Sequence, residues 1–147
     1  MRPTLIPFRA AHLETLTDRD TGGHQARRFA VEKEQRGPAF TALVGADILA
    51  CAGVMVVWPG VGFAWVVLGT DAPRYRLWLT RTIRAVLADI TRSLGLHRVE
   101  AVVLADSPRN LRWIRALGFR PENDIAQAYT QDQRDVVRFE RVQGDAA

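Results

Sequence analysis

The sequence has very few of the residues and segments that cross-link a protein or anchor it in a membrane. Its 147 residues include one cysteine, Cys51, which excludes an internal disulfide and a cysteine-based metal cluster. No apolar run reaches the roughly 18 residues of a membrane-spanning helix, and Met1–Thr4 lacks the apolar core of a secretory signal. We therefore expect no membrane segment, and a soluble chain in a reducing, cytoplasmic compartment.

Lysine and histidine are also scarce. Of the 20 basic residues, only Lys33 is not arginine, and the formal net charge is +4. Arginine neutralises phosphate and stacks on bases, which is one argument for nucleic-acid binding. Because the charge is modest and no block of five or six like charges occurs, we do not expect nucleic acid as the partner. The three histidines lack carboxylates at ligand spacing, so we expect no metal site.

What the sequence does contain is typical of one globular domain. Apolar residues make up 48% of it, an ordinary fraction for a packed domain. The length fits one domain on the usual prior of roughly 100–200 residues per domain. We find no repeat and no linker, and therefore expect a single domain over residues 1–147.

The hydrophobic pattern predicts a mixed α/β chain of the α+β type, in the order β-α-α-β-β-β-α-β-α-β-β. The expected strands are 4–8, 39–44, 48–57, 63–68, 98–104 and 135–142, with 120–129 irregular or strand-like; the expected helices are 10–17, 24–35, 73–94 and 109–117. A strand, a long helix and a strand in succession imply a right-handed parallel crossover within a mixed sheet.

Three local features sharpen this prediction. Residues 48–57 are apolar throughout, so we expect both faces of that strand to be covered, with Cys51 as a small buried hydrophobe. The helix 73–94 carries one apolar stripe that ends at Leu94. Thr70 and Asp71 precede it, and either can cap the helix; we expect Asp71 to act as a cap rather than as a catalytic acid.

The stretch from Leu96 to Phe119 resembles a motif of the GNAT superfamily of acyl-CoA-dependent N-acyltransferases. It consists of a predicted strand, then Asp106-Ser107-Pro108, then a helix that ends in Leu117-Gly118-Phe119. The resemblance implies a mixed, mostly antiparallel sheet with a central parallel pair, flanked by helices. A fainter likeness joins Leu68-Gly69-Thr70-Asp71 to GNAT-like proteins encoded by tailed phages.

The resemblance also implies a chemistry. Acetyl-CoA would be the co-substrate and an amine the acceptor, with the thioester carbonyl held by backbone N–H groups of the fourth strand and the pyrophosphate at the start of the following helix. The positions that it assigns to coenzyme A are Val66, Val67, Leu68, Arg74, Arg76, Ser107 and Asn110.

The chain departs from the family pattern in two places. The loop after the fourth strand lacks the family's glycines, and Pro73 removes one of its N–H groups. The family's tyrosine, often the general acid, falls on Ile114, which cannot donate a proton. Tyr129 and Glu100 remain as candidates for catalysis, although Glu100 also fits a solvent-facing position on an alternating strand. His24 is a further candidate base near the expected acceptor side.

Three functions therefore stay open at this stage. The first is a GNAT-like acetyltransferase, active or degenerate. The second is a non-catalytic structural or assembly protein, with a second copy or a virion component as partner. The third is an RNA- or DNA-binding module. Arg109, Arg112 and Arg115 recur every three residues, which fits either an anion-binding stripe or a solvated helix face.

Overall fold

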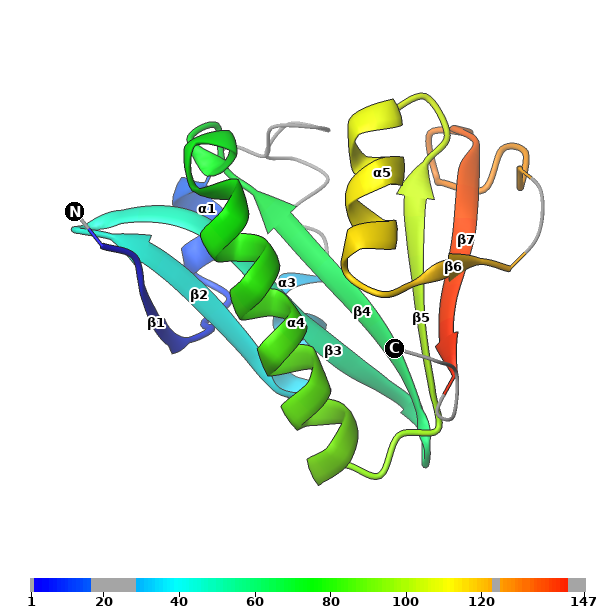
Figure 1. The fold of residues 1–147 in the computed structure, drawn as a ribbon, viewed down its shortest axis with the longest axis horizontal. Helices are drawn as coiled ribbons and strands as arrows, with labels where there is room; N and C mark the ends of the chain where they lie inside the picture. Colours follow the sequence, from blue (N-terminus) through cyan, green and yellow to red (C-terminus); the bar gives the residue numbers. More distant parts are fainter. Residues whose placement is uncertain (1, 17–28, 123–124, 143–147) are drawn as a thin grey trace. The chain divides into compact units, whose positions relative to one another are not determined.

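The computed structural model describes residues 2–16, 29–122 and 125–142. Figure 1 shows its elements, whose order confirms the predicted one. They are β1 (Thr4–Pro7), α1 (His12–Thr15), α3 (Ala30–Gln35), β2 (Ala39–Val44), β3 (Asp47–Trp58), β4 (Val61–Leu68), the 3₁₀ turn η1 (Ala72–Tyr75), α4 (Arg76–Ser93), β5 (Arg98–Leu104), α5 (Pro108–Ala116), β6 (Arg120–Pro121) and β7 (Val136–Val142).

The strands form one seven-stranded sheet in the order β1-β2-β3-β4-β5-β7-β6. The pairing of β4 with β5 is parallel, and the pairs β1–β2, β2–β3, β5–β7 and β6–β7 are antiparallel. The expected mixed, mostly antiparallel sheet with a central parallel pair and flanking helices is therefore confirmed. No helix in the described part of the chain is long and apolar enough to span a membrane.

The chain divides into two compact units. Unit 1 comprises Met1–Val56 and Ala64–Ile83, and unit 2 comprises Val57–Phe63 and Arg84–Ala147. Strands β3 and β4 and helix α4 contribute to both, so each of these elements changes unit along its length.

Unit 1 is built on the meander of β1, β2 and the first part of β3. Helices α1 and α3 lie behind these strands in Figure 1, on one face of the unit. Backbone hydrogen bonds prolong the β2–β3 ladder, because Val54 N–H donates to Pro38 O and Val56 N–H to Arg36 O. The largest buried side chains of this unit are Phe8, Leu13, Leu16, Leu49, Val54, Trp65, Val67, Leu68 and Leu79.

Strand β3 only partly follows the prediction that both its faces are covered. Leu49, Ala50 and Cys51 are buried in succession, as expected of a two-sided strand. At the other end Val57 is 48% exposed and Trp58 61% exposed. The prediction is therefore wrong for the end of β3, where an apolar sequence lies at the surface.

Unit 2 is built on β5, which pairs with β7 from Arg98↔Val142 to Leu104↔Val136. Helix α5 packs against β5 (Figure 1). The main buried side chains of unit 2 are Leu87, Ile90, Leu96, Val99, Ile114, Leu117, Phe119, Val136 and Phe139. Arg84 donates a hydrogen bond to the carbonyl of Ala116 at 3.1 Å, which satisfies an end carbonyl of α5.

Gly60 shapes the turn between β3 and β4. Its φ of +88° lies in the left-handed region, and a Cβ there would stand 2.4 Å from the His97 ring. Its carbonyl accepts hydrogen bonds from the N–H groups of His97 and Arg98. Only glycine therefore fits this turn, which ties the start of β4 to the start of β5.

The predicted helices differ from the observed ones at their ends. The segment expected as one helix over 73–94 begins with the 3₁₀ turn η1 before α4 starts at Arg76. Leu94 is 43% exposed, while Leu96 is buried, so the apolar stripe ends earlier than predicted. Helix α3 starts at Ala30, preceded by Phe29 with a left-handed φ of +59°; the rest of the helix expected from residue 24 lies outside the described residues.

Candidate functional site

The connection from β4 to α4 is the segment that the sequence assigns to the pyrophosphate. Three of its backbone N–H groups are occupied, because Gly69 donates to Leu49 O, Ala72 donates to Gly69 O and Arg74 donates to Asp71 O. Pro73 has no N–H to offer. These four positions therefore present no N–H group to an anion.

Asp71 does not cap the helix as predicted. It stands at the N-cap position of η1 with φ −90° and ψ −1°, but its side chain makes no capping hydrogen bond. An N-cap whose side chain bonds the first turn usually has an extended backbone, which Asp71 lacks. The tight 3₁₀ geometry closes the turn by backbone bonds instead, so its carboxylate is exposed beside the start of α4.

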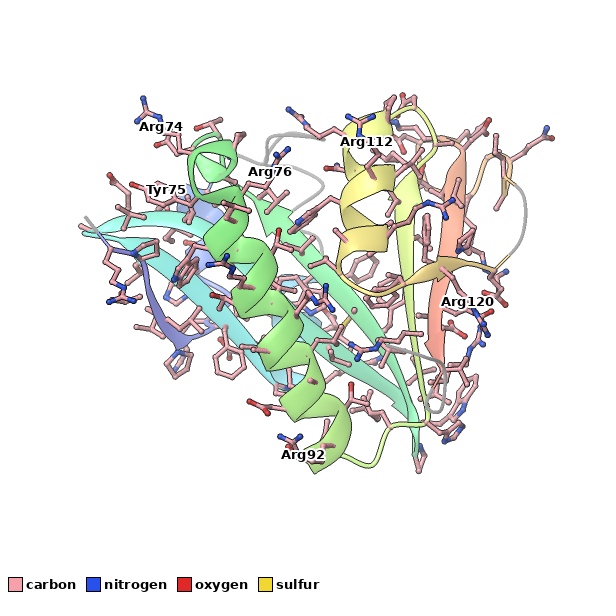
Figure 2. The ribbon with its side chains drawn as sticks, in the orientation of Figure 1. Arg74, Tyr75, Arg76, Arg92, Arg112 and Arg120 are labelled. Atoms are coloured by element: carbon pink, nitrogen blue, oxygen red, sulfur yellow. The ribbon has the colours of Figure 1, made fainter. Side chains whose placement is uncertain are left out.

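Arg74 and Arg76 are the cations of this segment, and both are exposed. Figure 2 shows that they leave the start of α4 in different directions. Two residues that are two positions apart on a helix face nearly opposite sides. The structure therefore presents two separate guanidinium groups rather than one bidentate clamp.

The last residues of β4 lead directly into this connection. Val67 and Leu68 are buried, and Val66 is 38% exposed. A Cβ on the next residue, Gly69, would lie 2.9 Å from both Leu49 O and Leu16 Cδ1. This glycine is therefore required by close packing within unit 1.

The start of α5, in unit 2, holds two other predicted residues. Ser107 and Asn110 are both half-buried, and the Ser107 side chain makes no capping hydrogen bond although it occupies the N-cap. Ile114, at the position of the family's tyrosine, is buried in the core. Arg109, Arg112 and Arg115 on this helix are all exposed, and the guanidinium of Arg115 also lies 5.8 Å from the centre of the Phe139 ring. This exposure fits both of the predicted roles of the stripe, anion binding and a solvated helix face.

Tyr129 lies in the loop between β6 and β7, and its side chain is 51% exposed. The loop is well tied, because Asp135 accepts a hydrogen bond from Ala128 N–H and Tyr129 N–H donates to Arg134 O. Arg134 also forms an ion pair with Asp106 at 3.3 Å. Since Asp106 precedes Ser107, the structure brings the Tyr129 loop to the same end of β5 as the start of α5.

Glu100 lies at the opposite end of β5 and belongs to an ion-pair cluster. Arg98 reaches Glu100 at 2.8 Å and Glu122 at 3.0 Å, and also pairs with Glu140. These bonds raise the pKa of Arg98, the hydrogen bond to Glu100 most of all. Glu100 is thus half-buried and paired with Arg98 rather than solvent-facing. The sequence did not predict the cluster because its other carboxylates, Glu122 and Glu140, come from distant segments.

A second set of polar contacts links the β1–α1 connection to the core of unit 1. The N–H of Arg9 donates to His12 Nδ1 at 3.1 Å, so this nitrogen is an acceptor and the proton of the neutral ring lies on Nε2. The Thr41 hydroxyl is 2.7 Å from the same nitrogen and 3.5 Å from Cys51 Sγ. Burial raises the pKa of Cys51 to about 11, although the hydrogen bond with Thr41 and the charge of Lys33 oppose it. Cys51 is therefore an unreactive thiol, in agreement with its predicted role in the core.

Of the two remaining histidines, one lies in the described part of the chain. His97 packs on Gly60 at the end of unit 2 far in sequence from the predicted site, and His24 lies outside the described residues. Within residues 2–16, 29–122 and 125–142, no group of three or more His, Cys, Asp or Glu side chains could hold a metal ion.

Trp65 and Lys33 form a contact that the sequence did not predict. Lys33 Nζ of α3 lies 5.1 Å from the centre of the Trp65 ring on β4. The ring of Phe8 packs edge-on against the same indole, with 5.1 Å between ring centres. Trp65 is only 9% exposed, and its indole nitrogen has no hydrogen-bond partner in the described part of the chain. No local sequence pattern predicts these contacts, because the three residues come from separate segments of the chain.

Comparison with known proteins identifies the fold. Neither a protein-family model nor a curated protein sequence matches the chain. Among solved structures, it is similar to the ribosomal-protein-S5-alanine acetyltransferase from Vibrio fischeri, with a TM-score of 0.72 and 12% identity over 99% of this chain and 95% of that one. It is also similar to the IAA acetyltransferase from Bacillus cereus, with a TM-score of 0.71 and 13% identity over 96% of this chain and 99% of that one.

A third similar structure contains ligands. The spermidine N-acetyltransferase from Vibrio cholerae, in complex with CoA and spermine, gives a TM-score of 0.70 and 12% identity over 96% of this chain and 95% of that one. At such identities the likeness establishes the fold, which these acetyltransferases share with this chain over nearly its whole length.

Proposed function

We propose that this chain, which has the GNAT fold, is an N-acyltransferase that moves the acetyl group of acetyl-CoA to an amine. The proposal rests on the parallel β4–β5 pair, which α4 joins within the seven-stranded sheet. This fold is similar to that of a solved acetyltransferase over 99% of this chain. In unit 2 this pairing runs over three residue pairs, from Val61↔Arg98 to Phe63↔Glu100.

The residues present fit the phosphates of coenzyme A through their charge. Arg74 and Arg76 are exposed cations at the start of α4, where the helix dipole also favours an anion. The N–H groups of Ala72 and Arg74 are occupied and Pro73 has none. We therefore assign the phosphates to the arginine side chains of unit 1, while Ser107 and Asn110 of unit 2 stay candidates that the family resemblance alone suggests.

Acetyl-CoA supplies a thioester, and the reaction exchanges its C–S bond for a C–N bond. The amine must lose one proton and the departing thiolate must gain one. Backbone N–H groups of Val66, Val67 and Leu68 would hold the carbonyl oxygen, on which negative charge develops. We propose Tyr129 as the proton donor to the thiolate, because a phenol can donate a proton and Ile114, at the position of the family's tyrosine, cannot.

Glu100 is a poor base for the amine. It forms an ion pair with Arg98 in the cluster, and breaking that pair would lower the free energy of unfolding. The amine proton then passes to solvent or to a group outside the described residues. We therefore expect the rate to depend on the fraction of acceptor that is already neutral at the working pH.

The test is thiol release from acetyl-CoA in the presence of a panel of amines, followed with a thiol reagent and with mass spectrometry of the amine. The background is low because Cys51, the single thiol of the chain, is fully buried. We expect equal amounts of thiol and N-acetyl amine. We also expect Arg74→Ala or Arg76→Ala to raise the KM for acetyl-CoA several-fold, while Arg92→Ala, on the exposed end of α4, leaves it unchanged.

Thiol release without any acetylated amine would reduce the proposal to a thioester hydrolase. No thiol release with any amine would contradict transfer altogether and leave a protein that keeps the fold for another purpose.

A further inference from the structure

We propose that prolines close both edges of the described sheet to strand addition, so that neither a second copy of this chain nor an extended peptide can lengthen it. The two edge strands are β1 in unit 1 and β6 in unit 2. This exclusion goes beyond the proposed transferase activity and does not depend on it.

Strand β1 is the kind of edge that invites pairing. The unpaired N–H and C=O groups of an edge strand can bond to another chain in an extended conformation. The strand reads Thr4-Leu5-Ile6-Pro7, and Leu5 is 40% exposed. Because threonine and isoleucine favour strands, the composition of β1 alone does not keep a second chain away.

The direction of each backbone group in β1 follows from the pairing with β2. In an antiparallel pair, residues that exchange hydrogen bonds with the partner strand alternate with residues that do not. Phe8 N–H donates to Ala39 O at 3.0 Å, and the unbroken register then places Ile6 and Thr4 in hydrogen-bonded pairs as well. The residues between them therefore direct their backbone groups away from β2, toward the edge of the sheet.

These outward residues are Leu5 and Pro7 in β1 and Pro3 just before it. Proline has no backbone N–H, so Leu5 alone can donate a hydrogen bond outward. In a two-fold pairing of β1 with a second copy, Leu5 would face Leu5 and each Pro3 would face a Pro7. Only the Leu5 pair would form hydrogen bonds, and the carbonyls brought to the prolines would lose water without gaining a donor.

Strand β6 is closed in the same way. It contains only Arg120 and Pro121. Glu122 N–H donates to Arg138 O at 2.8 Å, and the register Arg120↔Glu140 has the same phase, so Pro121 is the outward residue between two hydrogen-bonded pairs. The outward position of β6 therefore has no N–H, and its short length limits pairing further. An extended peptide that needs donors from the sheet finds few at either edge.

The experiment restores the missing donors in the full chain. Pro3→Thr/Pro7→Thr gives β1 an N–H at each outward position, and Pro121→Thr does the same for β6. Sedimentation velocity over a wide range of protein concentration measures self-association. We expect Pro3→Thr/Pro7→Thr to lower the dissociation constant of a dimer about tenfold or more, because several backbone hydrogen bonds become possible. Pro121→Thr should lower it less, and the control Pro108→Thr, at the exposed start of α5, should leave it unchanged.

Amide exchange of the ¹⁵N-labelled chain shows whether the edge is the surface that associates. In the unsubstituted chain, Leu5 N–H should exchange quickly and Ile6 N–H slowly. In the associated Pro3→Thr/Pro7→Thr variant, the amides at positions 3, 5 and 7 should become protected. A pair of single variants checks the outward assignment by urea unfolding: Ile6→Pro should destabilise the chain far more than Leu5→Pro, because only Ile6 N–H belongs to the β1–β2 ladder.

Three results would overturn the closure of β1. The first is a Pro3→Thr/Pro7→Thr variant that associates no more than Pro108→Thr. The second is association in which the amides at positions 3, 5 and 7 still exchange quickly. The third is a slowly exchanging Leu5 amide in the unsubstituted chain, which would mean that the edge is already paired. A Pro121→Thr variant that behaves like the control would remove β6 from the proposal.

Discussion

Replacing Arg98 by methionine should destabilise unit 2 at the point where β4 and β5 pair. Arg98 faces Val61 in the parallel register, and its side chain is 23% exposed. It neutralises Glu100 and Glu140, which stand directly opposite each other on β5 and β7. Methionine keeps most of the apolar stem but removes the charge. Two carboxylates would then face each other across the ladder, which is destabilising in a sheet.

The size of the effect follows from the burial of the cluster. Breaking a fully buried ion pair costs about 3–5 kcal/mol, and an exposed pair contributes only about 0–1 kcal/mol. The side chains of Arg98, Glu100, Glu122 and Glu140 are between 16% and 35% exposed. We therefore expect Arg98→Met to lower the free energy of unfolding by about 2–3 kcal/mol, and the Tm by roughly 6–10 °C for a chain of this length.

Urea unfolding and thermal melts provide the assay, with Arg92→Met as the matched control. Arg92 pairs with Asp89 at 2.5 Å, but the two side chains are 76% and 70% exposed, so the control should cost less than about 0.5 kcal/mol. Adding Glu140→Gln to Arg98→Met should restore part of the loss, because one of the two facing charges disappears. An Arg98→Met loss no larger than that of the control, or no recovery in the double variant, would refute the assigned role of the cluster.

Three further predictions follow from other parts of the fold. Cys51→Ala should make the free energy of unfolding less sensitive to alkaline pH, because burial raises the pKa of the Cys51 thiol to about 11. The stability that the neutral thiol contributes is complete below its unfolded pKa, near 9, and is lost as the pH rises toward 11. The loss in the unsubstituted protein should be about 1.4 kcal/mol at pH 10. Equal pH slopes in both proteins between pH 8 and 10 would contradict this. Gly60→Ala should cost about 2 kcal/mol in urea unfolding, because of its left-handed φ and the approach to His97; a neutral change would mean that the turn relaxes. Tyr129→Phe should lower kcat for acetyl transfer at least tenfold without changing the KM for acetyl-CoA, and an unchanged kcat would remove Tyr129 from the reaction.

Local sequence patterns predicted the elements well where one face of each is buried. Strands β2 and β5 start and end at the predicted residues, because alternation and flanking turns mark both ends of each strand. The start of α4 was less well predicted: Pro73 suits a first helical turn in either an α or a 3₁₀ geometry, and the chain adopts the latter. The cap at Asp71 failed for the same reason.

Contacts between distant segments were beyond the sequence. The Arg98 cluster joins β5 to Glu140 of β7 and to Glu122 just after β6, and the contact of Lys33 with Trp65 joins α3 to β4. Neither depends on a local period, so each becomes visible only when the sheet order is known. The resemblance to acyltransferases rests on the helix that ends in Leu117-Gly118-Phe119. The same helix carries Ile114 at the position of the family's tyrosine, and this buried isoleucine cannot donate a proton. The predicted coenzyme A residues stay predictions, and the structure adds that three N–H groups of their loop, those of Gly69, Ala72 and Arg74, are already hydrogen-bonded.

The most direct test of the account is the melting temperature of the full chain with and without millimolar acetyl-CoA. A ligand at about 100 times its Kd adds roughly 2.7 kcal/mol to the stability of the native state, so the account predicts a clear rise in Tm. The rise should shrink in Arg74→Ala or Arg76→Ala and persist in Arg92→Ala. An unchanged Tm at millimolar acetyl-CoA would contradict the central claim that this fold binds an acyl-CoA.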